Sequence, residues 1–379
     1  MLQEFISFTK KTFNTEEFIP LHAPIFLGNE KEYLNECIDS TFVSSVGKFV
    51  DQFEADLAKF IGVKHAIATS NGTAALHIGL LMAGVQEGDE VITQPLTFIA
   101  TCNAISYIKA QPVFVDVDKK TLGLSAEKLK HFLDKNAVVV NEECINKITK
   151  RKIKAVVPMH TFGFAADITE IIDICNQYSI NVVEDAAESL GSYYKGKHTG
   201  THGLVGAFSF NGNKTITTGG GGMLVTNDDS IALKAKHITT TAKIPHPWDY
   251  EHDMVGFNYR LPNINAALGC AQLEKLPYIL ERKKILSNKY DTFFKNKTIQ
   301  YLKGPKDSNS NYWLNAIILE NLKERNNFLK VTNENGVMTR PIWKLMTKLT
   351  MFKNSQIGNL DNAEWLEERV VNIPSSVII

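Results

Sequence analysis

The sequence predicts an α/β fold in which a large domain with a mainly parallel sheet precedes a smaller α+β domain. Up to about residue 226, short apolar strands alternate with helical segments, which is typical of a parallel sheet covered by helices. After residue 260 this alternation stops, and a long helical region precedes mixed strands and helices. We therefore expect an N-terminal arm over 1–25, a large domain over 26–260 and a small domain over 261–379. Ligands should bind at the carboxyl ends of the parallel strands.

Composition argues against several classes of function. The chain has 41 basic and 41 acidic residues, so no net charge points to nucleic acid or an anionic membrane as a partner. Five scattered cysteines without a C-x-x-C pair disfavour a disulfide framework or a zinc site, and we expect no metal. The sequence starts without a continuous apolar signal region, and no apolar run approaches the length of a membrane span. We expect a protein of the reducing cytoplasm that binds small molecules.

The N-terminal arm ends in F-I-P-L-H-A-P, where two prolines favour extended chain over helix. Such arms often pack on a partner subunit. Helical periodicity follows over Glu30–Cys37 and Phe49–Phe60. The loop between these helices contains Ser44 and Ser45, which either line a pocket or merely turn the chain.

The first strand and helix of the alternating region are joined by the turn Ser70-Asn71-Gly72-Thr73. Free backbone N–H groups and the positive end of the helix dipole meet at such a turn, which makes it a candidate phosphate site. The alternative is that Ser70 or Thr73 simply caps the helix.

A second unit consists of the strand E-V-I-T, the loop Q-P-L-T-F, a helix and the strand P-V-F-V-D-V-D. Phe98 lies where the loop meets the helix, outside the periodic core positions, and we interpret it as a ring that stacks on a flat ligand. A helix is expected over 126–133, and the basic stretch 141–154 is typical of a solvated insertion. The strand A-V-V-P then leads to M-H-T-F-G and to a helix over Ile168–Tyr178.

Two acids, Glu184 and Asp185, end the apolar strand I-N-V-V-E-D. Neighbouring residues of a strand face opposite sides, so only one of them can face a site at the strand end. A carboxylate there could keep the ring nitrogen of a pyridinium cofactor protonated. The alternative is an exposed acid at the end of the strand.

A lysine lies at a turn between two strands. The strand Val205–Phe210 ends at Asn211-Gly212-Asn213, Lys214 follows, and four glycines lead into the strand Met223–Thr226. A lysine held still in this way can act as a nucleophile toward an aldehyde, and glycines allow close approach of backbone to a ligand. The alternative is a solvated lysine on a surface hairpin.

The carboxyl-terminal part begins with a long helical region, Leu261–Asn296, which we expect to be broken near Pro277. The strand Y-W-L-N-A-I-I-L, a helix over Lys323–Asn333 and the strand V-M-T-R-P-I complete the small domain.

In combination, these segments resemble the DegT/DnrJ/StrS family of sugar aminotransferases, which are pyridoxal 5′-phosphate (PLP) enzymes of fold type I. The resemblance runs from about Phe18 to the C-terminus. It implies a homodimer with composite active sites. The motifs that carry it are S-N-G-T-A-A-L, P-L-T-F-I-A-T-C-N-A-I, P-V-F-V-D-V-D, E-D-A-A-E-S-L-G, S-F-N-G-N-K-T-I-T-T-G-G-G-G-M and G-F-N-Y-R-L-P-N-I-N-A-A-L-G.

The resemblance assigns a role to each matching residue. Lys214 is the Schiff-base lysine, Asp185 pairs with the pyridine nitrogen, and Phe98 stacks on the ring. An amide change at the neighbouring Glu184 should therefore be mild. The other cofactor-binding positions are Asn71, Gly72, Thr73, His160, Glu188, Ser209, Asn213 and, from the neighbouring subunit, Asn258.

Two positions depart from the family pattern. The family often has Gln where this chain has Glu188, and Glu where it has Gly220. Neither change removes a group that the chemistry requires. A dehydratase branch of the family replaces the lysine by histidine, so Lys214 argues against that branch.

Further segments resemble the LegC-type branch, which aminates C4 of a UDP-linked 4-keto-6-deoxy-N-acetylhexosamine. They are I-P-L-H-A-P with the arm before it, S-T-F-V-S-S-V-G-K-F-V, T-R-P-I-W and E-R-V-V-N-I-P-S-S. This resemblance implies a ping-pong reaction with L-glutamate and a nucleotide-linked ketosugar, in bacillosamine- or legionaminic-acid-type biosynthesis for surface glycans.

The substrate residues are less defined. Arg260 and Arg340 suit the glutamate carboxylate or the nucleotide diphosphate, although each could equally form an ion pair at a surface or domain interface. The remaining candidates are Ser44, Ser45, Tyr259 and Tyr312. The alternatives are an aminotransferase for a GDP- or dTDP-ketosugar (perosamine-type, or acting at C3), a PLP-dependent dehydratase, and a non-catalytic regulator.

Overall fold

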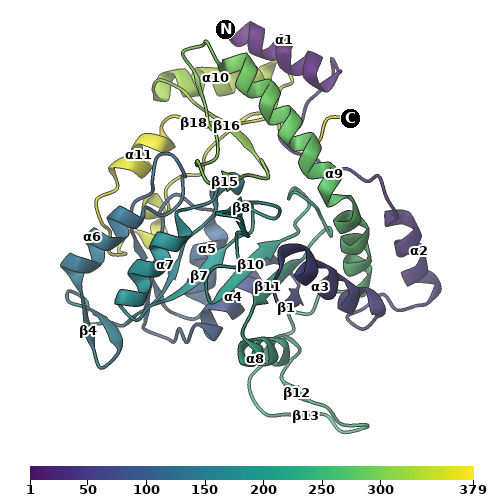
Figure 1. Ribbon diagram of the computed structural model, residues 1–379, viewed down its shortest axis with the longest axis vertical. Coiled ribbons are helices and arrows are strands. Elements are labelled where there is room, and N and C mark those ends of the chain that lie inside the picture. Colours follow the sequence, from purple (N-terminus) through teal and green to yellow (C-terminus); the bar gives the residue numbers. More distant parts are fainter.

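The computed structural model describes residues 1–379 and contains a central sheet of seven strands in the order β1-β11-β10-β7-β6-β2-β3 (Figure 1). Only β11 runs antiparallel to its neighbours, β1 and β10; the other neighbours are parallel. The expected α/β class with a mainly parallel sheet is confirmed. The strands are β1 (His65–Thr69), β2 (Glu90–Thr93), β3 (Gln111–Phe114), β6 (Ile153–Val157), β7 (Asn181–Asp185), β10 (Val205–Ser209) and β11 (Gly222–Thr226).

Helices cover both faces of this sheet because its strands are apolar on both sides. In β7, Val183 belongs to the core beneath α4, α5 and α8, whereas its neighbour Val182 belongs to the core beneath α6 and α7. Both valines are buried. One face carries α4 (Gly72–Met82), α5 (Ile99–Tyr107) and α8 (Asp229–Thr239); the other carries α3 (Lys48–Ile61), α6 (Ala126–Asn136), α7 (Ile168–Gln177) and the first half of α9 (Asn263–Phe294).

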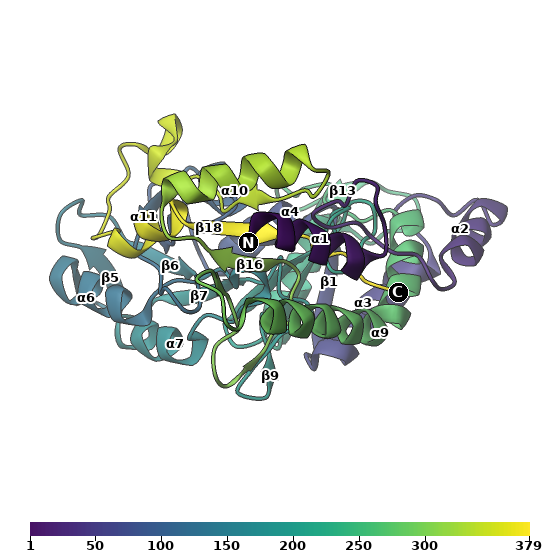
Figure 2. The same ribbon diagram turned by 90° about the horizontal axis from the view of Figure 1, so that it is seen from above.

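The small domain is built on a four-stranded antiparallel sheet in the order β14-β16-β18-β17 (Figure 2). Its strands are β14 (Gln300–Tyr301), β16 (Asn315–Ile318), β17 (Arg340–Pro341) and β18 (Val370–Ile373). The second half of α9 and the helices α10 (Leu322–Glu334) and α11 (Asp361–Glu367) pack around it. Short 3-10 turns lie at Thr161–Gly163, Met346–Lys348 and Thr350–Phe352.

A short strand pairing ties the two parts together next to the site. Between the small-domain strands β14 and β16, β15 (Ser308–Asn309) pairs with β8 (Tyr193–Tyr194), which also pairs with β9 (Lys197–His198). This pairing places residues 311–313 beside the segment that follows β7, because the backbone of Asn311 is fixed directly after β15.

The N-terminal arm differs from the expectation. Residues Leu2–Phe13 form helix α1, which lies beside α10 and α9 (Figures 1 and 2). Phe5 and Ile6 are buried in the same cluster as Tyr290 and Phe328 of the small domain. The spacing of the apolar residues in α1 gives one apolar face, which this chain's own small domain covers. Only the following proline-containing stretch is extended.

Helix α9 is continuous through Pro277, so the expected break is wrong. A proline removes one backbone hydrogen bond and is tolerated where the freed carbonyl can be hydrated. Pro277 is exposed, whereas Leu276 and Ile279 next to it are buried. The packed apolar face therefore keeps the helix continuous while its outer face accommodates the ring.

The basic insertion over 141–154 is more ordered than expected. It contributes to a hairpin of β4 (Ala137–Val140) and β5 (Glu143–Asn146), and the side chains of Cys144 and Asn146 are buried. The remaining elements are helix α2 (Glu30–Asp39) and the exposed hairpin β12 (Lys243–Ile244) and β13 (Glu251–His252), which projects from the body below α8 (Figure 1). No helix combines the length and apolarity needed to cross a membrane.

Candidate active site

A cavity of about 320 Å³ lies at the carboxyl ends of β7 and β10 and at the amino ends of α4 and α5. This is where ligands are expected in an α/β sheet. Residues far apart in the sequence meet here because consecutive parallel strands end at the same edge. Nine of the sequence-predicted residues line the cavity: Asn71, Gly72, Thr73, Phe98, Asp185, Glu188, Ser209, Asn213 and Lys214.

Lys214 lies in the turn between β10 and β11, and its side chain is largely buried with 13% of its surface exposed. Its Nζ donates a hydrogen bond of 3.2 Å to Glu188 Oε1 and lies 3.9 Å from the ring centroid of Trp313. The Trp313 indole is held in turn by a 2.6 Å hydrogen bond from its Nε1 to the Asn213 carbonyl. The amine is therefore fixed in place, unlike that of a solvated hairpin lysine.

Asp185 is 2% exposed, and both its carboxylate oxygens have donors. Thr101 Oγ1 donates to Oδ2 at 2.6 Å, and the Ala187 N–H donates to Oδ1 at 3.2 Å. Burial raises the pKa of Asp185, and these hydrogen bonds oppose that shift. A cation in the cavity would stabilise the ionised form, so this carboxylate is suited to a protonated ring nitrogen.

The amino end of α4, the candidate anion site, lies at the cavity. Asn71 caps the helix, with its Oδ1 accepting from the Ala74 N–H at 2.8 Å. The preceding N–H groups, those of Gly72 and Thr73, have no acceptor within the helix and lie at the cavity with Ser209. A Cβ at Gly72 would come within 2.8 Å of the Ser209 Cβ, so this glycine allows helix and strand to approach.

Comparison with known proteins agrees with this geometry. Residues 26–378 match the model of the DegT/DnrJ/EryC1/StrS aminotransferase family. The chain belongs to this family. It is similar to the GDP-perosamine synthase of Escherichia coli O157:H7, with 38% identity over 95% of this chain and 93% of that protein. It is also similar to the putative PLP-dependent aminotransferase EpsN of Bacillus subtilis, with 38% identity over 88% and 84% of the two chains.

Solved structures show the same fold. The aminotransferase TlmJ of Streptoalloteichus hindustanus superposes with a TM-score of 0.85 at 26% identity, covering 94% of this chain and 93% of the other. Helicobacter pylori PseC superposes with a TM-score of 0.85 at 24% identity, covering 94% of each chain. The fold is that of the fold type I aminotransferases. The protein is thus a PLP-dependent sugar aminotransferase of the DegT/DnrJ family.

The aminotransferase cavity fits PLP. Lys214 offers an amine, Asp185 a buried carboxylate, the amino end of α4 a phosphate site, and Phe98 a half-exposed ring at the amino end of α5. When bound, PLP acts as an electron sink and carries the amino group between substrates. The lining thus contains a group for each polar part of the cofactor.

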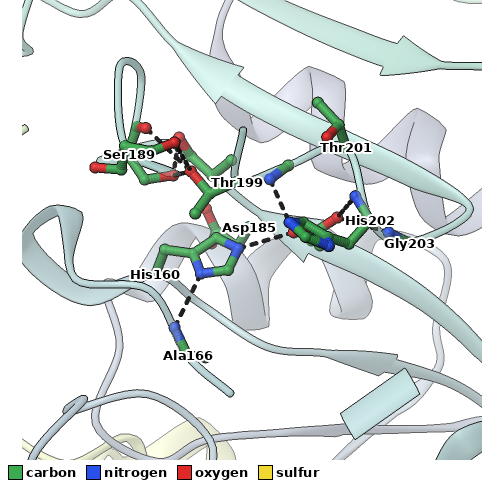
Figure 3. A network of polar contacts seen from close by, with 12 residues as sticks. His160, Ala166, Asp185, Ser189, Thr199, Thr201, His202 and Gly203 are labelled. Carbon is green, nitrogen blue, oxygen red and sulfur yellow. Dashed lines mark hydrogen bonds and ion pairs between the residues drawn. The ribbon is translucent and has the colours of Figure 1, made fainter. Parts of the chain in front are cut away.

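His160, which the family resemblance places among the cofactor-binding positions, does not line the cavity of this structure. Its ring is fully buried; Nδ1 accepts from the Ala166 N–H at 3.2 Å, and Nε2 lies 2.9 Å from Glu184 Oε2 (Figure 3). With Nδ1 acting as the acceptor, Nε2 carries the proton donated to Glu184. His160 supports the strand end that carries Asp185, since its own N–H donates to the Asp185 carbonyl.

Glu184 and Asp185 face opposite sides, as expected, but Glu184 has a structural role that the sequence did not indicate. It is fully buried and accepts from the backbone N–H groups of Gly200, His202 and Gly203 at 2.8, 2.6 and 2.6 Å. These bonds, together with that from His160, satisfy a carboxylate which holds the 200–203 loop (Figure 3). These contacts lead us to expect a destabilising effect of the amide variant in place of a mild one.

Besides His160, seven predicted residues do not line this chain's cavity: Ser44, Ser45, Asn258, Tyr259, Arg260, Tyr312 and Arg340. Asn258 is exposed and accepts from Arg260 Nε at 3.0 Å. Arg340 is exposed and donates to Asn333 Oδ1 at 3.0 Å, and the Tyr259 hydroxyl lies 3.1 Å from His77 Nδ1. These positions serve the site only if a substrate or a second subunit extends it.

Several contributors to the site were missed, among them two tryptophans and a threonine. Trp313 and Trp343 line the cavity from the small-domain side, and Thr101 holds Asp185. The ring of Tyr312 packs against Phe164, and the next residue, Trp313, lines the cavity. The available signal was the adjacent aromatic pair Tyr312-Trp313. For Trp343, the signal was its place at the end of T-R-P-I-W.

Proposed function

We propose that the aminotransferase moves the amino group of L-glutamate to the C4 keto group of a UDP-linked 4-keto-6-deoxy-N-acetylhexosamine. The product would serve bacillosamine- or legionaminic-acid-type synthesis for surface glycans. The observation that carries the transfer chemistry is Lys214, buried at the cavity with its amine held at a defined point. The UDP-sugar is supported by the sequence segments that resemble the LegC-type branch.

Different residues of this chain have different roles in the proposed reaction. The Lys214 amine takes the proton from Cα of glutamate and later returns a proton to C4 of the sugar. Asp185 keeps the cofactor's ring nitrogen protonated, and the Gly72 and Thr73 N–H groups hold its phosphate. Trp313 and Trp343 close the apolar side of the cavity and exclude water from the reacting atoms.

We further propose that the protein works as a homodimer with shared active sites. Asn258 lies outside its own chain's cavity, near the projecting β12–β13 hairpin. Apolar side chains of this region are strongly exposed, with Trp248 at 76%, Tyr250 at 83% and Val255 at 89%. Apolar groups that gather in an exposed segment favour a protein partner.

A GDP-linked ketosugar is the second candidate substrate. It is supported by two relatives, of 38% and 36% identity, that are GDP-perosamine synthases. Both candidates require the same lysine and cofactor site, so they differ only in the part of the site that receives the nucleotide.

The test is release of 2-oxoglutarate from glutamate with a panel of UDP-, GDP- and dTDP-linked 4-keto-6-deoxy sugars, with product positions assigned by NMR. We expect turnover with the UDP-linked N-acetylhexosamine and an amine at C4. Preference for the GDP-sugar would favour the second candidate. Ketosugar release without glutamate consumption would indicate a dehydratase, and cofactor binding without any turnover would indicate a regulator.

A further inference from the structure

The Glu188 carboxylate has one donor on each of its oxygens. Lys214 Nζ donates to Oε1 at 3.2 Å, and the Phe162 N–H donates to Oε2 at 2.9 Å. The Glu188 side chain is 1% exposed, so solvent does not compete for either oxygen. A glutamine, the residue usual in the family, has one oxygen and one NH₂ group, so its NH₂ would face one of these two donors.

The second donor belongs to a strained turn. Phe162 has φ 58° and ψ 13°, an unfavourable region for a bulky residue, and its ring is fully buried against Trp343 at a centroid distance of 5.1 Å. A carboxylate that accepts the Phe162 N–H helps to hold this turn. Glu188 therefore connects the reactive lysine to the wall formed by Phe162 and Trp343.

The Lys214 amine is held from two sides, by the Glu188 carboxylate and by the face of Trp313. Both partners favour a charged ammonium. From these contacts we infer that Glu188 is the positioning residue of the free Lys214 amine, which its carboxylate holds as an ammonium against the face of Trp313. The inference rests on aminotransferase chemistry and not on the identity of the sugar.

Burial and the charge of Lys214 act in opposite directions on the ionisation of Glu188. Burial raises the pKa of Glu188 to about 7, Lys214 opposes this shift, and the nearby Asp185 adds to it. His22 also faces Lys214, and burial lowers its pKa, so it is neutral there. Both ring nitrogens of His22 lack a hydrogen-bond partner, which leaves Glu188 as the anion that contacts the amine.

The test compares wild type, Glu188→Gln and the control Glu90→Gln. Glu90 is also buried and has a raised pKa, but it lies at the opposite end of β2 from the cavity and bonds to Asn146. The full chain is freed of cofactor and treated with an amine-acylating reagent across a pH series, and labelling of Lys214 is measured by peptide mass spectrometry. In parallel, the glutamate half-reaction of the loaded enzyme is measured against pH.

We expect Glu188→Gln to lower the pH midpoint of Lys214 labelling by roughly one unit, because the ammonium loses its anion. The glutamate half-reaction should slow by about tenfold or more, with KM changed less than about threefold, and the inflection near pH 7 should disappear. Glu90→Gln should resemble wild type in the labelling midpoint, in the rate of the glutamate half-reaction and in the inflection near pH 7. A Glu188→Gln labelling profile that superimposes on that of wild type overturns the inference, whatever the turnover. If Glu188→Gln does not fold, the pH profile of Lys214 labelling in wild type provides the test. Two inflections in this profile support the inference, and a single inflection overturns it.

Discussion

His160 Nε2 and Glu184 Oε2 lie 2.9 Å apart in a part of the core where neither side chain has any exposed surface. The contact is distinct from the cavity, yet it supports the strand end from which Asp185 faces the cofactor. The histidine bond, the three backbone N–H donors of the 200–203 loop and the neighbouring Ser189–Thr199 bonds form one polar network (Figure 3). The site thus depends on a buried scaffold that touches no ligand.

The first prediction concerns this scaffold. Glu184→Gln replaces one oxygen by an NH₂ group that faces donors, so it should lower the free energy of unfolding by about 2–4 kcal/mol. Turnover should also fall, because the end of β7 loses support. Denaturant unfolding measures the first effect. The Glu90→Gln variant, which loses a buried carboxylate far from this network, should keep its turnover; equal loss of turnover in both variants would contradict a specific role for Glu184.

The second prediction concerns the covalent link to the cofactor. Lys214→Ala should leave a folded protein without the visible absorbance of lysine-bound PLP, since the amine is gone. Borohydride reduction of wild type should attach the cofactor to the peptide that contains Lys214. Lys109→Ala, at an exposed lysine, should behave as wild type. A reduced adduct on another lysine would show that the assignment is wrong.

The third prediction concerns Asp185. Asp185→Asn should lower kcat by at least about 10²-fold, because a neutral amide does not keep the ring nitrogen protonated. The cofactor-free variant should be about as stable as wild type: burial makes the charge of this carboxyl costly, the Ala187 N–H keeps an oxygen acceptor, and the Thr101 hydroxyl can turn to accept from the new NH₂ group. Thermal unfolding of both cofactor-free proteins checks this. A variant with wild-type turnover would rule out the proposed role.

The fourth prediction is a loss of stability in acid caused by His198. This buried side chain accepts from the Gly191 N–H at Nε2 (2.8 Å), and its Nδ1 lies 2.6 Å from the Thr199 carbonyl, an arrangement that requires the neutral ring. Burial lowers its pKa from 6.5 to about 4. The unfolded chain therefore binds a proton at a higher pH than the folded one, and stability falls as pH drops from about 6.5 to about 4.

This contribution is on the order of 3 kcal/mol, and a pH series of denaturant titrations measures it. NMR titration of the His198 ring locates the group directly. A ring that titrates near pH 6.5 in the folded protein would contradict the assignment.

The fifth prediction tests the shared active site. A Lys214→Ala subunit and an Asn258→Ala subunit should complement, because one site of their heterodimer carries both lesions and the other carries neither. Random equal mixing makes half of the dimers heterodimers, so roughly a quarter of all sites should recover full activity. Subunit exchange is verified by mass. A mixture that stays as inactive as its two components would show that Asn258 serves its own subunit.

Much of the fold was predictable because local patterns in the sequence indicate its strands, turns and helices. Apolar strands ended by turns and followed by helices define parallel units, and the carboxyl ends of such strands meet at one edge. This reasoning made Asp185 and the turn at Asn71 candidates at that edge, and the family resemblance joined them with Lys214 in one cofactor site. Where local patterns competed, as at Pro277, burial of the neighbouring face decided the outcome.

The sequence by itself determined the α/β class, the family, the cofactor and the two residues expected to hold it, Lys214 by a covalent bond and Asp185 at the ring nitrogen. Only the tertiary structure decided that Trp313 and Trp343 close the cavity, that Glu184 is a buried anchor and that α1 packs on its own small domain. These features depend on contacts between segments distant in the chain, such as the pairing of β15 with β8. Local propensity carries no information on such contacts. They form because particular apolar faces and particular unpaired polar groups have to be buried against each other.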